Sequence, residues 1–306
     1  MHLSKNYNLI TVLGPTASGK TRFAACLAKE IEGEIISADS RQVYRKMDIG
    51  TGKDYRDYIV NDWQVPYHLV DIVDPGYEYN VYEYQRDFVA TYQDITNRKK
   101  FPVLCGGSGL YIEAVLKGYK LINVPVNSLL RKELDKKSME ELTEILVSFK
   151  KLHNKTDIET RKRLIRAIEI EEYYNRHPEN QTDYPELNTL IIGIHFDRET
   201  RRMRITERLM QRFEGGMIKE VKKLLDSGLS YDQLIYYGLE YKYITLYLRG
   251  DIDYESMVNS LNTAIHQLAK RQMTWFRRME RNGIKIHWLD GQIPIKERIE
   301  KVMALL

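Results

Sequence analysis

Cysteine and long apolar runs are what this 306-residue sequence has least of. Its two cysteines, Cys26 and Cys105, are too few for a framework of disulfide bonds. No apolar run approaches the roughly 20 residues that a transmembrane helix needs, and Met1 to Tyr7 lack the apolar stretch of a secretion signal. We therefore expect a soluble, cytoplasmic protein with no membrane attachment.

A large excess of charge of one sign is also absent. Lysine and arginine number 47 against 43 aspartate and glutamate, which gives a formal net charge of +4. So small an excess does not by itself indicate a nucleic-acid partner, for which a local concentration of basic residues would count. The sequence has no internal repeat, and its length suits one large domain or two small ones. We take the protein to be a monomer.

What the sequence does contain is an alternation of strands and helices. Leu9–Leu13, Ile35–Ile36 and Phe101–Cys105 are short apolar runs that each lead into a glycine-rich or polar loop. Between the first two, apolar residues recur at every fourth position from Phe23 to Ile31, which is typical of a helix. This order predicts an α/β fold with a P-loop NTPase-like parallel sheet flanked by helices. Three loops should then meet at the carboxyl edge of the sheet, where such folds bind ligands: residues 14–21, 37–44 and 106–109.

The middle of the chain has a different character. Residues 123–156 are highly charged, with leucines at helical spacing, and this pattern predicts a small helical insertion. Residues 1–122 and 157–306 would then form the core. Within the second part, Leu190–Ile194 is again strand-like, several helices follow, and the alternation in Ile284–Trp288 predicts a last strand.

The segment Gly14–Thr21 carries the most specific motif, G-x-x-x-x-G-K-[ST] between a strand and a helix. Its glycines let backbone N–H groups curl around phosphate oxygens, and the helix N-terminus adds positive potential. Lys20 supplies a mobile cation, and the Thr21 hydroxyl can ligate Mg²⁺. The residues predicted to bind phosphates are Gly14, Thr16, Ala17, Ser18, Gly19, Lys20 and Thr21. A glycine turn without a ligand is the plainer alternative, and the motif names a polyphosphate but no reaction.

A second polar loop follows the second strand. It reads Asp39-Ser40-Arg41-Gln42-Val43-Tyr44, and Asp48-Ile49-Gly50-Thr51-Gly52-Lys53 comes four residues later. A carboxylate at the rim of the sheet beside a phosphate loop can act as a general base or hold a metal. Asp39 or Ser40 can equally serve as a helix N-cap. The residues alone leave both interpretations open.

With these segments in this order, the chain resembles the tRNA dimethylallyltransferase (tRNA isopentenyltransferase) family. The resemblance continues through Val65–Pro75, Gly106–Tyr111, Arg163–Glu169 and Leu268–Arg277. The matches cover most of the chain, from about Leu9 to Leu289. Such an ordered series is far more specific than the phosphate motif alone.

The resemblance implies a reaction and assigns residues to it. The exocyclic N6 amine of an adenosine beside the tRNA anticodon would attack dimethylallyl diphosphate, while Lys20, the loop amides and Mg²⁺ stabilise the departing diphosphate. Asp39 would be the general base, and Ser108, where threonine is common, would contact the diphosphate or the amine. An extruded base would be held by Ser40, Arg41 and Gln42. The residues assigned to tRNA are Asp39, Ser40, Arg41, Gln42, Lys162, Arg163, Arg166 and Arg271, and the insertion at 123–156 would grip the RNA.

Basic residues gather in two places in the C-terminal half. One group, spaced at three or four residues, predicts a basic stripe on a helix: Arg201, Arg204, Arg208 and Arg212. The other group is Lys270, Arg271, Arg277, Arg278 and Arg281, interleaved with Trp275 and Phe276, which we expect in the core. A solvated helix face is the commoner explanation of such runs. Together with the resemblance, the two groups favour contacts with RNA phosphates.

The chain departs from the family pattern at three points. The insertion at 123–156 is short, the family's usual Gly-Tyr pair is rearranged in Tyr236–Tyr241, and His266 replaces a common arginine. A neutral histidine supplies one fixed cation fewer. These changes leave room for an altered RNA or a smaller acceptor.

Three other functions are therefore considered. The first is prenyl transfer to a free adenine nucleotide. The second is a P-loop kinase, with Asp71 or Asp74 holding Mg²⁺ and Arg163 and Arg166 as lid arginines. The third is a non-catalytic, nucleotide-dependent RNA binder, against which the complete phosphate motif argues.

Overall fold

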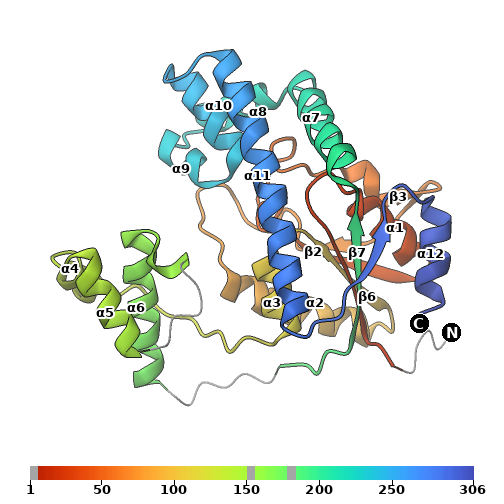
Figure 1. Ribbon diagram of the computed structural model, residues 1–306, viewed down its shortest axis with the longest axis horizontal. Helices are drawn as coiled ribbons and strands as arrows, with labels where there is room; N and C mark the ends of the chain where they lie inside the picture. Colours follow the sequence, from red (N-terminus) through yellow and green to blue (C-terminus); the bar gives the residue numbers. More distant parts are fainter. Residues whose placement is uncertain (1–5, 150–155, 178–183) are drawn as a thin grey trace. The chain divides into compact units, whose positions relative to one another are not determined.

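The protein divides into two compact units. The computed structural model describes residues 6–149, 156–177 and 184–306. The core unit comprises Met1–Tyr119 and Pro185–Leu306, and the second unit is Lys120–Tyr184 (Figure 1). No helix in the described part of the chain has the length and apolar character that crossing a bilayer would require.

The core unit is built on a six-stranded sheet in which every neighbouring pair is parallel. The strands, in spatial order, are β5 (Tyr67–His68), β2 (Gly33–Ala38), β6 (Phe101–Gly106), β1 (Leu9–Leu13), β7 (Thr189–His195) and β8 (His287–Asp290). Parallel neighbours need crossover connections, which the helices between the strands supply. The predicted α/β fold class is confirmed.

Helices cover both faces of this sheet, because successive strand side chains point to opposite sides. In β1, Ile10 and Val12 pack in one hydrophobic cluster with α1 (Lys20–Glu30) and α12 (Ile295–Met303). Leu9 and Leu13 belong to a second cluster on the other face. Its helices include α2 (Val81–Asn97), α3 (Gly109–Leu116) and α11 (Tyr254–Arg281). Both faces of β1 are therefore buried, as a central strand requires.

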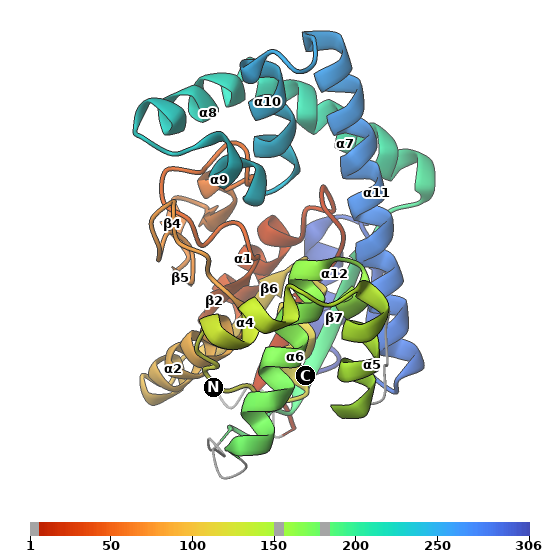
Figure 2. The same ribbon diagram turned by 90° about the vertical axis from the view of Figure 1, so that its left-hand side faces the viewer.

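A group of helices lies beyond the carboxyl ends of the strands. It comprises α7 (Arg198–Glu214), α8 (Met217–Asp226), α9 (Tyr231–Tyr236) and α10 (Leu239–Arg249). Since α7 begins two residues after β7 ends, the helix lies beyond the edge where the strands end (Figure 2). A 3₁₀ turn at Tyr55–Tyr58 and a small hairpin of β3 (Ile59–Val60) and β4 (Trp63–Gln64) complete the rim.

The second unit is longer than the sequence predicts. It contains α4 (Ser128–Leu134), α5 (Met139–Phe149), a 3₁₀ turn (Thr156–Ile158) and α6 (Arg161–Arg176). The expected insertion ended at residue 156 and left α6 in the core. In the structure α6 belongs to this unit, because its apolar side chains share one small core with α4 and α5: Leu134, Leu142, Leu146, Leu164, Ile165, Ala167 and Ile168. Residues 150–155 of the expected insertion lie outside the described residues.

The last strand begins three residues later than expected, at His287 rather than Ile284. The reason lies at the end of α11, where the Ile284 N–H donates to the Met279 carbonyl at 3.1 Å and so closes the helix. Trp288 then pairs with Gly193 of β7. A Cβ on Gly193 would lie 2.4 Å from the Trp288 ring, so only glycine fits there.

We expect Gly193→Ala to lower the free energy of unfolding by about 1–3 kcal/mol, because it overpacks a buried site. Chemical denaturation would measure the change. Shortening the opposing side chain with Trp288→Leu should make the added methyl group less costly, so that the two substitutions are not additive. Strict additivity would contradict the clash.

Candidate active site at the carboxyl edge of the sheet

The phosphate motif forms a curled loop between β1 and α1. The Ser18 N–H donates to the Pro15 carbonyl at 3.3 Å, and Gly19 takes a left-handed conformation with φ 72° just before α1. Gly14 lies so close to β7 that a Cβ would be 2.6 Å from the Ile194 carbonyl oxygen. The two glycines are therefore required, one for the turn and one for the close approach.

Gln272, from the far end of the sequence, holds this loop to its neighbour. Its side-chain oxygen accepts a hydrogen bond from the Thr16 N–H at 2.8 Å, and its side-chain amide donates to the Gly107 carbonyl at 2.9 Å. The loops after β1 and β6 are thus joined through α11. Sequence reasoning assigned Gln272 no role, although it lies within the recognised segment Leu268–Arg277.

Lys20 extends from the start of α1 into a crowded positive environment. Burial lowers the pKa of its ammonium group; Cys105 and Asp39 act to raise that pKa, and Arg208 and Arg212 lower it further. The Lys20 ammonium donates only one long hydrogen bond within the described residues, 3.4 Å to the Pro15 carbonyl. A bound anion would satisfy this cation and favour its charged form.

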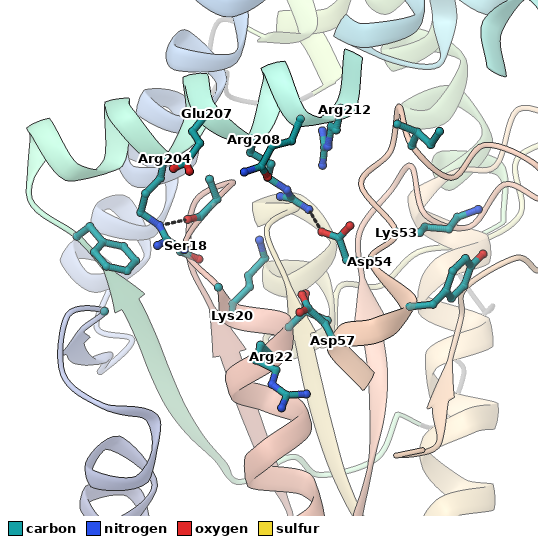
Figure 3. Close-up of a pocket in the computed structure, with 18 of the residues that line it drawn as sticks. Ser18, Lys20, Arg22, Lys53, Asp54, Asp57, Arg204, Glu207, Arg208 and Arg212 are labelled. Carbon is teal, nitrogen blue, oxygen red and sulfur yellow. Dashed lines mark hydrogen bonds and ion pairs between the residues drawn. The ribbon is translucent and has the colours of Figure 1, made fainter. Parts of the chain in front are cut away.

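A cleft of about 860 Å³ opens beside the loop, between α1, α7 and α12 (Figure 3). Seven of its lining side chains are basic and four are acidic. The basic ones are Lys20, Arg22, Lys53, Arg204, Arg208, Arg212 and Arg298, and the acidic ones are Asp48, Asp54, Asp57 and Glu207. Such an excess of cations beside curled backbone amides suits a polyphosphate.

The arginines of α7 divide between two sites, where the sequence predicted one stripe. Arg204, Arg208 and Arg212 line the cleft beside the phosphate loop, whereas Arg201 lines a separate groove with Lys270 and Arg277. The division follows from helix geometry, since residues four apart share a face. Arg204, Arg208 and Arg212 of the predicted stripe therefore face the phosphate loop.

Two of these cleft arginines have carboxylate partners. Arg208 donates to Asp54 at 2.6 Å (Figure 3). Arg212 forms an ion pair with Glu240 at 3.3 Å. Burial lowers the pKa of Arg212 to about 10 and raises that of Glu240. Arg204 instead donates to the Ala17 carbonyl of the phosphate loop at 3.0 Å.

Asp39 and Ser108 come from adjacent strands and meet through the loop after β2. The Asp39 Oδ1 accepts hydrogen bonds from the N–H groups of Arg41 and Gln42, at 2.9 and 3.4 Å. The Ser108 Oγ accepts one from the Ser40 N–H at 3.0 Å. Asp39 therefore does cap a turn, and its carboxylate is fixed at the rim of the sheet rather than free to swing.

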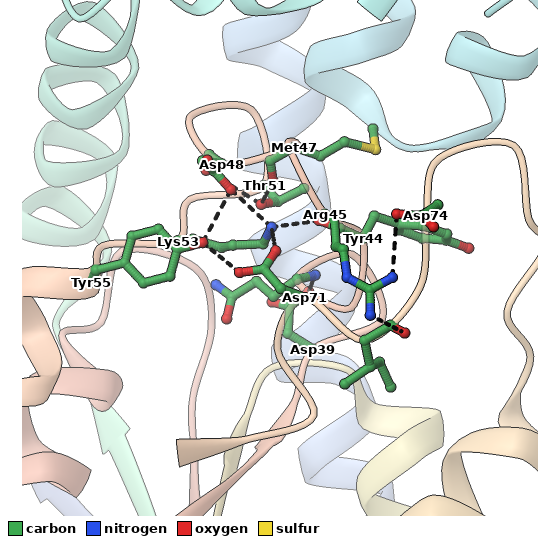
Figure 4. A network of polar contacts seen from close by, with 12 residues as sticks. Asp39, Tyr44, Arg45, Met47, Asp48, Thr51, Lys53, Tyr55, Asp71 and Asp74 are labelled. Carbon is green, nitrogen blue, oxygen red and sulfur yellow. Dashed lines mark hydrogen bonds and ion pairs between the residues drawn. The ribbon is translucent and has the colours of Figure 1, made fainter. Parts of the chain in front are cut away.

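The loop of residues 48–53 is held in place by the buried side chain of its own last residue, Lys53 (Figure 4). The Lys53 ammonium contacts the carboxylates of Asp48 and Asp71 and the Tyr44 carbonyl. The Tyr55 hydroxyl also donates to Asp71, at 2.6 Å. Since the Asp71 N–H donates in turn to the Gln42 carbonyl at 3.1 Å, this network supports the loop that carries Asp39.

Glu220 of α8 fixes the same loop from the other side. Its carboxylate accepts hydrogen bonds from three consecutive N–H groups, those of Asp48, Ile49 and Gly50, at 2.9, 2.7 and 3.0 Å. The Tyr241 hydroxyl adds a fourth at 2.6 Å, and its ring fills the space that a Cβ on Gly50 would need. The segment Asp48–Lys53 is thus held in place by the carboxylate of Glu220.

The two acids considered for a kinase are already engaged. Asp71 belongs to the Lys53 network, and Asp74 pairs with Arg45 at 3.2 Å on the surface. Both carboxylates therefore already have a basic partner, and of the two only Asp71 supports the loops around the site.

The residues assigned to tRNA lie in both units. In the core, the Arg41 guanidinium stands 5.4 Å from the centre of the Tyr236 ring, so the rearranged segment Tyr236–Tyr241 supports it. Arg271 is exposed on α11. In the second unit, Lys162 is on α6, Arg163 pairs with Glu159 at 2.6 Å, and Arg166 pairs with Glu169.

The second basic group and the replaced arginine also have defined surroundings. Phe276 is fully buried, and Arg278 stacks on the Trp275 ring at 4.1 Å while pairing with Glu113 at 2.6 Å, so these residues belong to packing. Burial lowers the pKa of His266, and Arg202 and Arg201 lower it further. These surroundings favour the neutral form of His266.

The fold and the cleft together define a protein of the α/β class with a P-loop-like sheet and a cationic cleft beside the loop of its phosphate motif. The sequence model of the IPP transferase family matches residues 42–279, and that of isopentenyl transferases matches residues 7–61. The protein therefore belongs to the IPP transferase family.

Individual relatives match over almost the whole chain. The protein is 61% identical to tRNA dimethylallyltransferase 2 of Bacteroides fragilis over 98% of both chains. It is 59% identical to tRNA dimethylallyltransferase 1 of Parabacteroides distasonis over 99% of this chain and 98% of that one. Among solved structures, the full-length tRNA isopentenylpyrophosphate transferase of Bacillus halodurans matches with a TM-score of 0.71 and 32% identity, over 98% and 95% of the chains.

We expect Glu220→Ala to destabilise the protein by about 2–3 kcal/mol, because it strands backbone N–H groups that the carboxylate satisfies. Chemical denaturation would measure this loss. Glu214→Ala, which removes an exposed carboxylate from the neighbouring helix, should change stability little. Equal effects of the two substitutions would refute the anchoring role.

The lowered pKa of Lys20 predicts a pH-dependent affinity for pyrophosphate. In the free protein the pKa of the Lys20 ammonium group lies below its usual range. A bound anion raises this pKa, because it stabilises the protonated form. Affinity should therefore be greatest below that pKa and fall as the pH rises through it. Calorimetry from about pH 7 to about pH 10 would measure the fall.

Lys20→Arg is the control for that titration, because arginine keeps its charge over the whole range. Any pH dependence that remains in this variant belongs to pyrophosphate or to other groups of the cleft, such as Arg212. If the variant and the natural protein gave parallel curves, Lys20 would not be the titrating group.

Proposed function

We propose that the protein transfers the dimethylallyl group of dimethylallyl diphosphate to the exocyclic N6 amine of an adenosine adjacent to the tRNA anticodon. The observation that carries the proposal is one juxtaposition. A cationic phosphate cleft lies at the same sheet edge as Asp39 and Ser108, which are held together by the loop after β2. Family membership and the names of relatives up to 61% identical support it.

The proposed step needs a carbon donor, a nucleophile and a base. The amine nitrogen forms a bond to the first carbon of the dimethylallyl group while the bond from that carbon to the diphosphate oxygen breaks. Asp39 accepts the amine proton, and the electron pair leaves with the diphosphate. Lys20 and the N–H groups of the phosphate loop stabilise the charge that develops there.

Mg²⁺ would fit beside the same loop. Thr21 and Asp57, which both carry side-chain oxygens, line the cleft. Mg²⁺ commonly takes one or two protein oxygens and completes its shell with substrate phosphates and water. When bound, it would neutralise part of the charge on the departing diphosphate.

An RNA acceptor is favoured over a free nucleotide. The relative from Bacteroides fragilis is covered over 98% of its length, so an insertion of this size accompanies the name tRNA dimethylallyltransferase. The groove that contains Arg201, Lys270 and Arg277 offers further cations for a phosphate backbone. Asp39, Ser40, Arg41 and Gln42 would hold the base, with Lys162, Arg163, Arg166 and Arg271 on the RNA.

The cellular setting follows from the acceptor and the cysteines. Cys26 and Cys105 are both free thiols, as is usual in a reducing compartment. We place the protein in the cytoplasm, acting as a monomer.

The central experiment incubates the purified protein with dimethylallyl diphosphate, Mg²⁺ and either bulk tRNA or free AMP, ADP and ATP. Mass spectrometry should find a prenylated adenosine in the tRNA and none in the nucleotides. Asp39→Ala should lower the rate about 10²- to 10⁴-fold, the usual contribution of a general base, while pyrophosphate still binds.

Two outcomes would contradict the proposal. Prenylation of the free nucleotides alone would change the acceptor, and phosphate transfer from ATP without the prenyl donor would change the reaction class. Asp74→Ala is a matched control, because it removes a surface carboxylate outside the site and should leave the rate unchanged.

A further inference from the structure

Arg298 is a buried cation in the phosphate cleft that no recognised motif contains. It lies on α12, beyond residue 279, where the match to the IPP transferase family ends. The residue is only 6% exposed, yet its side chain lines the cleft. Its guanidinium stands 5.3 Å from the centre of the Phe23 ring of α1. Packing therefore fixes the side chain in place.

This guanidinium has no ion-pair partner among the described residues. Its Nε is buried without a hydrogen-bond partner, and no carboxylate within residues 6–149, 156–177 and 184–306 forms an ion pair with it. Burial lowers the pKa of Arg298; Cys26 raises it, Arg204 lowers it and Asp290 raises it. Charged side chains are seldom buried unless they are paired. A buried cation without an ion pair among the described residues is suited to a negative ligand.

Two further groups at the same end of the cleft share this state. Arg204 has no ion pair among the described residues, and its terminal nitrogen stands 3.8 Å from where a Cβ of Gly19 would be. The Ser18 hydroxyl is 3% exposed and has no hydrogen-bond partner. By contrast, Arg208 and Arg212 of the same cleft are paired with carboxylates.

The order of the strands gives this end of the cleft its direction. Asp39 and Ser108 follow β2 and β6, which lie on one side of β1. Arg204 and Arg298 are on helices that follow β7 and β8, which lie on the other side. The phosphate loop follows β1, which lies between these two pairs of strands.

We propose that Arg298, together with Arg204 and the Ser18 hydroxyl, binds the terminal phosphate of the prenyl donor. The proposal rests on the proposed function in one respect, the identity of the donor. The carbon that is attacked must face the acceptor amine beside Asp39, so the phosphate that carries the prenyl group lies on that side of the loop. The terminal phosphate then extends toward β7 and β8, where Arg298, Arg204 and the Ser18 hydroxyl would bind it.

The consequence is that α12 completes the donor site. Two guanidinium groups can each present a planar fork of N–H donors to phosphate oxygens. They would recognise a diphosphate in preference to a monophosphate, because only the diphosphate reaches them. The helix is held against α1 by apolar contacts that include Val302, so the site is formed before the ligand arrives.

The test compares pyrophosphate and dimethylallyl monophosphate as ligands, by calorimetry in the presence of Mg²⁺. For Arg298→Met we expect the dissociation constant for pyrophosphate to rise about tenfold to a hundredfold, the range for a hydrogen-bonded charge. The dissociation constant for the monophosphate should stay within about twofold. Lys301→Met, which removes an exposed cation from the same helix, is the matched control and should change neither.

Three results would overturn the proposal. Arg298→Met could fold and bind pyrophosphate as tightly as the natural protein. It could lose both ligands equally, which would make Arg298 a purely structural residue. If this variant does not fold, Arg298→Lys is the variant to measure, because it keeps the charge and the buried stem but not the planar fork. An unchanged dissociation constant for pyrophosphate in Arg298→Lys would count against the proposal. A dissociation constant several-fold higher would support it.

The measurements use a single ligand and no RNA acceptor, so they do not depend on prenyl transfer. A failure to modify tRNA would contradict the proposed function while the preference for pyrophosphate persisted. Conversely, an active enzyme whose pyrophosphate affinity is indifferent to Arg298 would retain the proposed function and lose this inference. The two proposals can therefore fail separately.

Discussion

The parallel arrangement of the strands is the constraint on which this site depends. Because every strand runs the same way, the segments after β1, β2, β6, β7 and β8 all emerge at one edge. Residues that are more than 200 positions apart in the chain, such as Thr16 and Gln272, can meet there through a single hydrogen bond. An antiparallel sheet would send half of these loops to the opposite edge.

The cations at that edge fall into two groups. Some form ion pairs with carboxylates, and others do not. Lys53, Arg208 and Arg212 have carboxylate neighbours and contribute to the architecture of the cleft. Lys20, Arg204 and Arg298 have no ion pair among the described residues and surround the phosphate loop. In the proposed function, a bound anion would offset the cost of holding these unpaired cations together.

Local sequence signals were sufficient for the phosphate loop, the strands before it and after it, and the rim carboxylate Asp39. A glycine pattern between an apolar run and a helical period determines both conformation and chemistry within about eight residues. The placement of Ser108 beside the loop of Asp39 also followed, because strand order in an α/β sheet constrains which loops are neighbours. The two alternatives for Asp39 proved compatible, since its carboxylate caps a turn and remains at the rim.

Long-range contacts were beyond the reach of the same reasoning. The roles of Gln272 and Glu220 rest on hydrogen bonds to loops at residues 16 and 48–50, and nothing in their own neighbourhood announces them. The arginines of α7 formed one stripe in the sequence, and only the positions of the phosphate loop and of α11 divided them between two sites. The assignment of α6 to the second unit likewise depended on which apolar faces met.

The sequence by itself determined the class of fold, the position of the phosphate motif and the family, because these depend on short motifs in a fixed order. The tertiary structure alone decided which cations of the cleft have a carboxylate partner and which do not. That distinction is a matter of distance to a carboxylate, and Arg298, near the end of the chain and with no motif around it, acquires its place only when α12 packs beside α1.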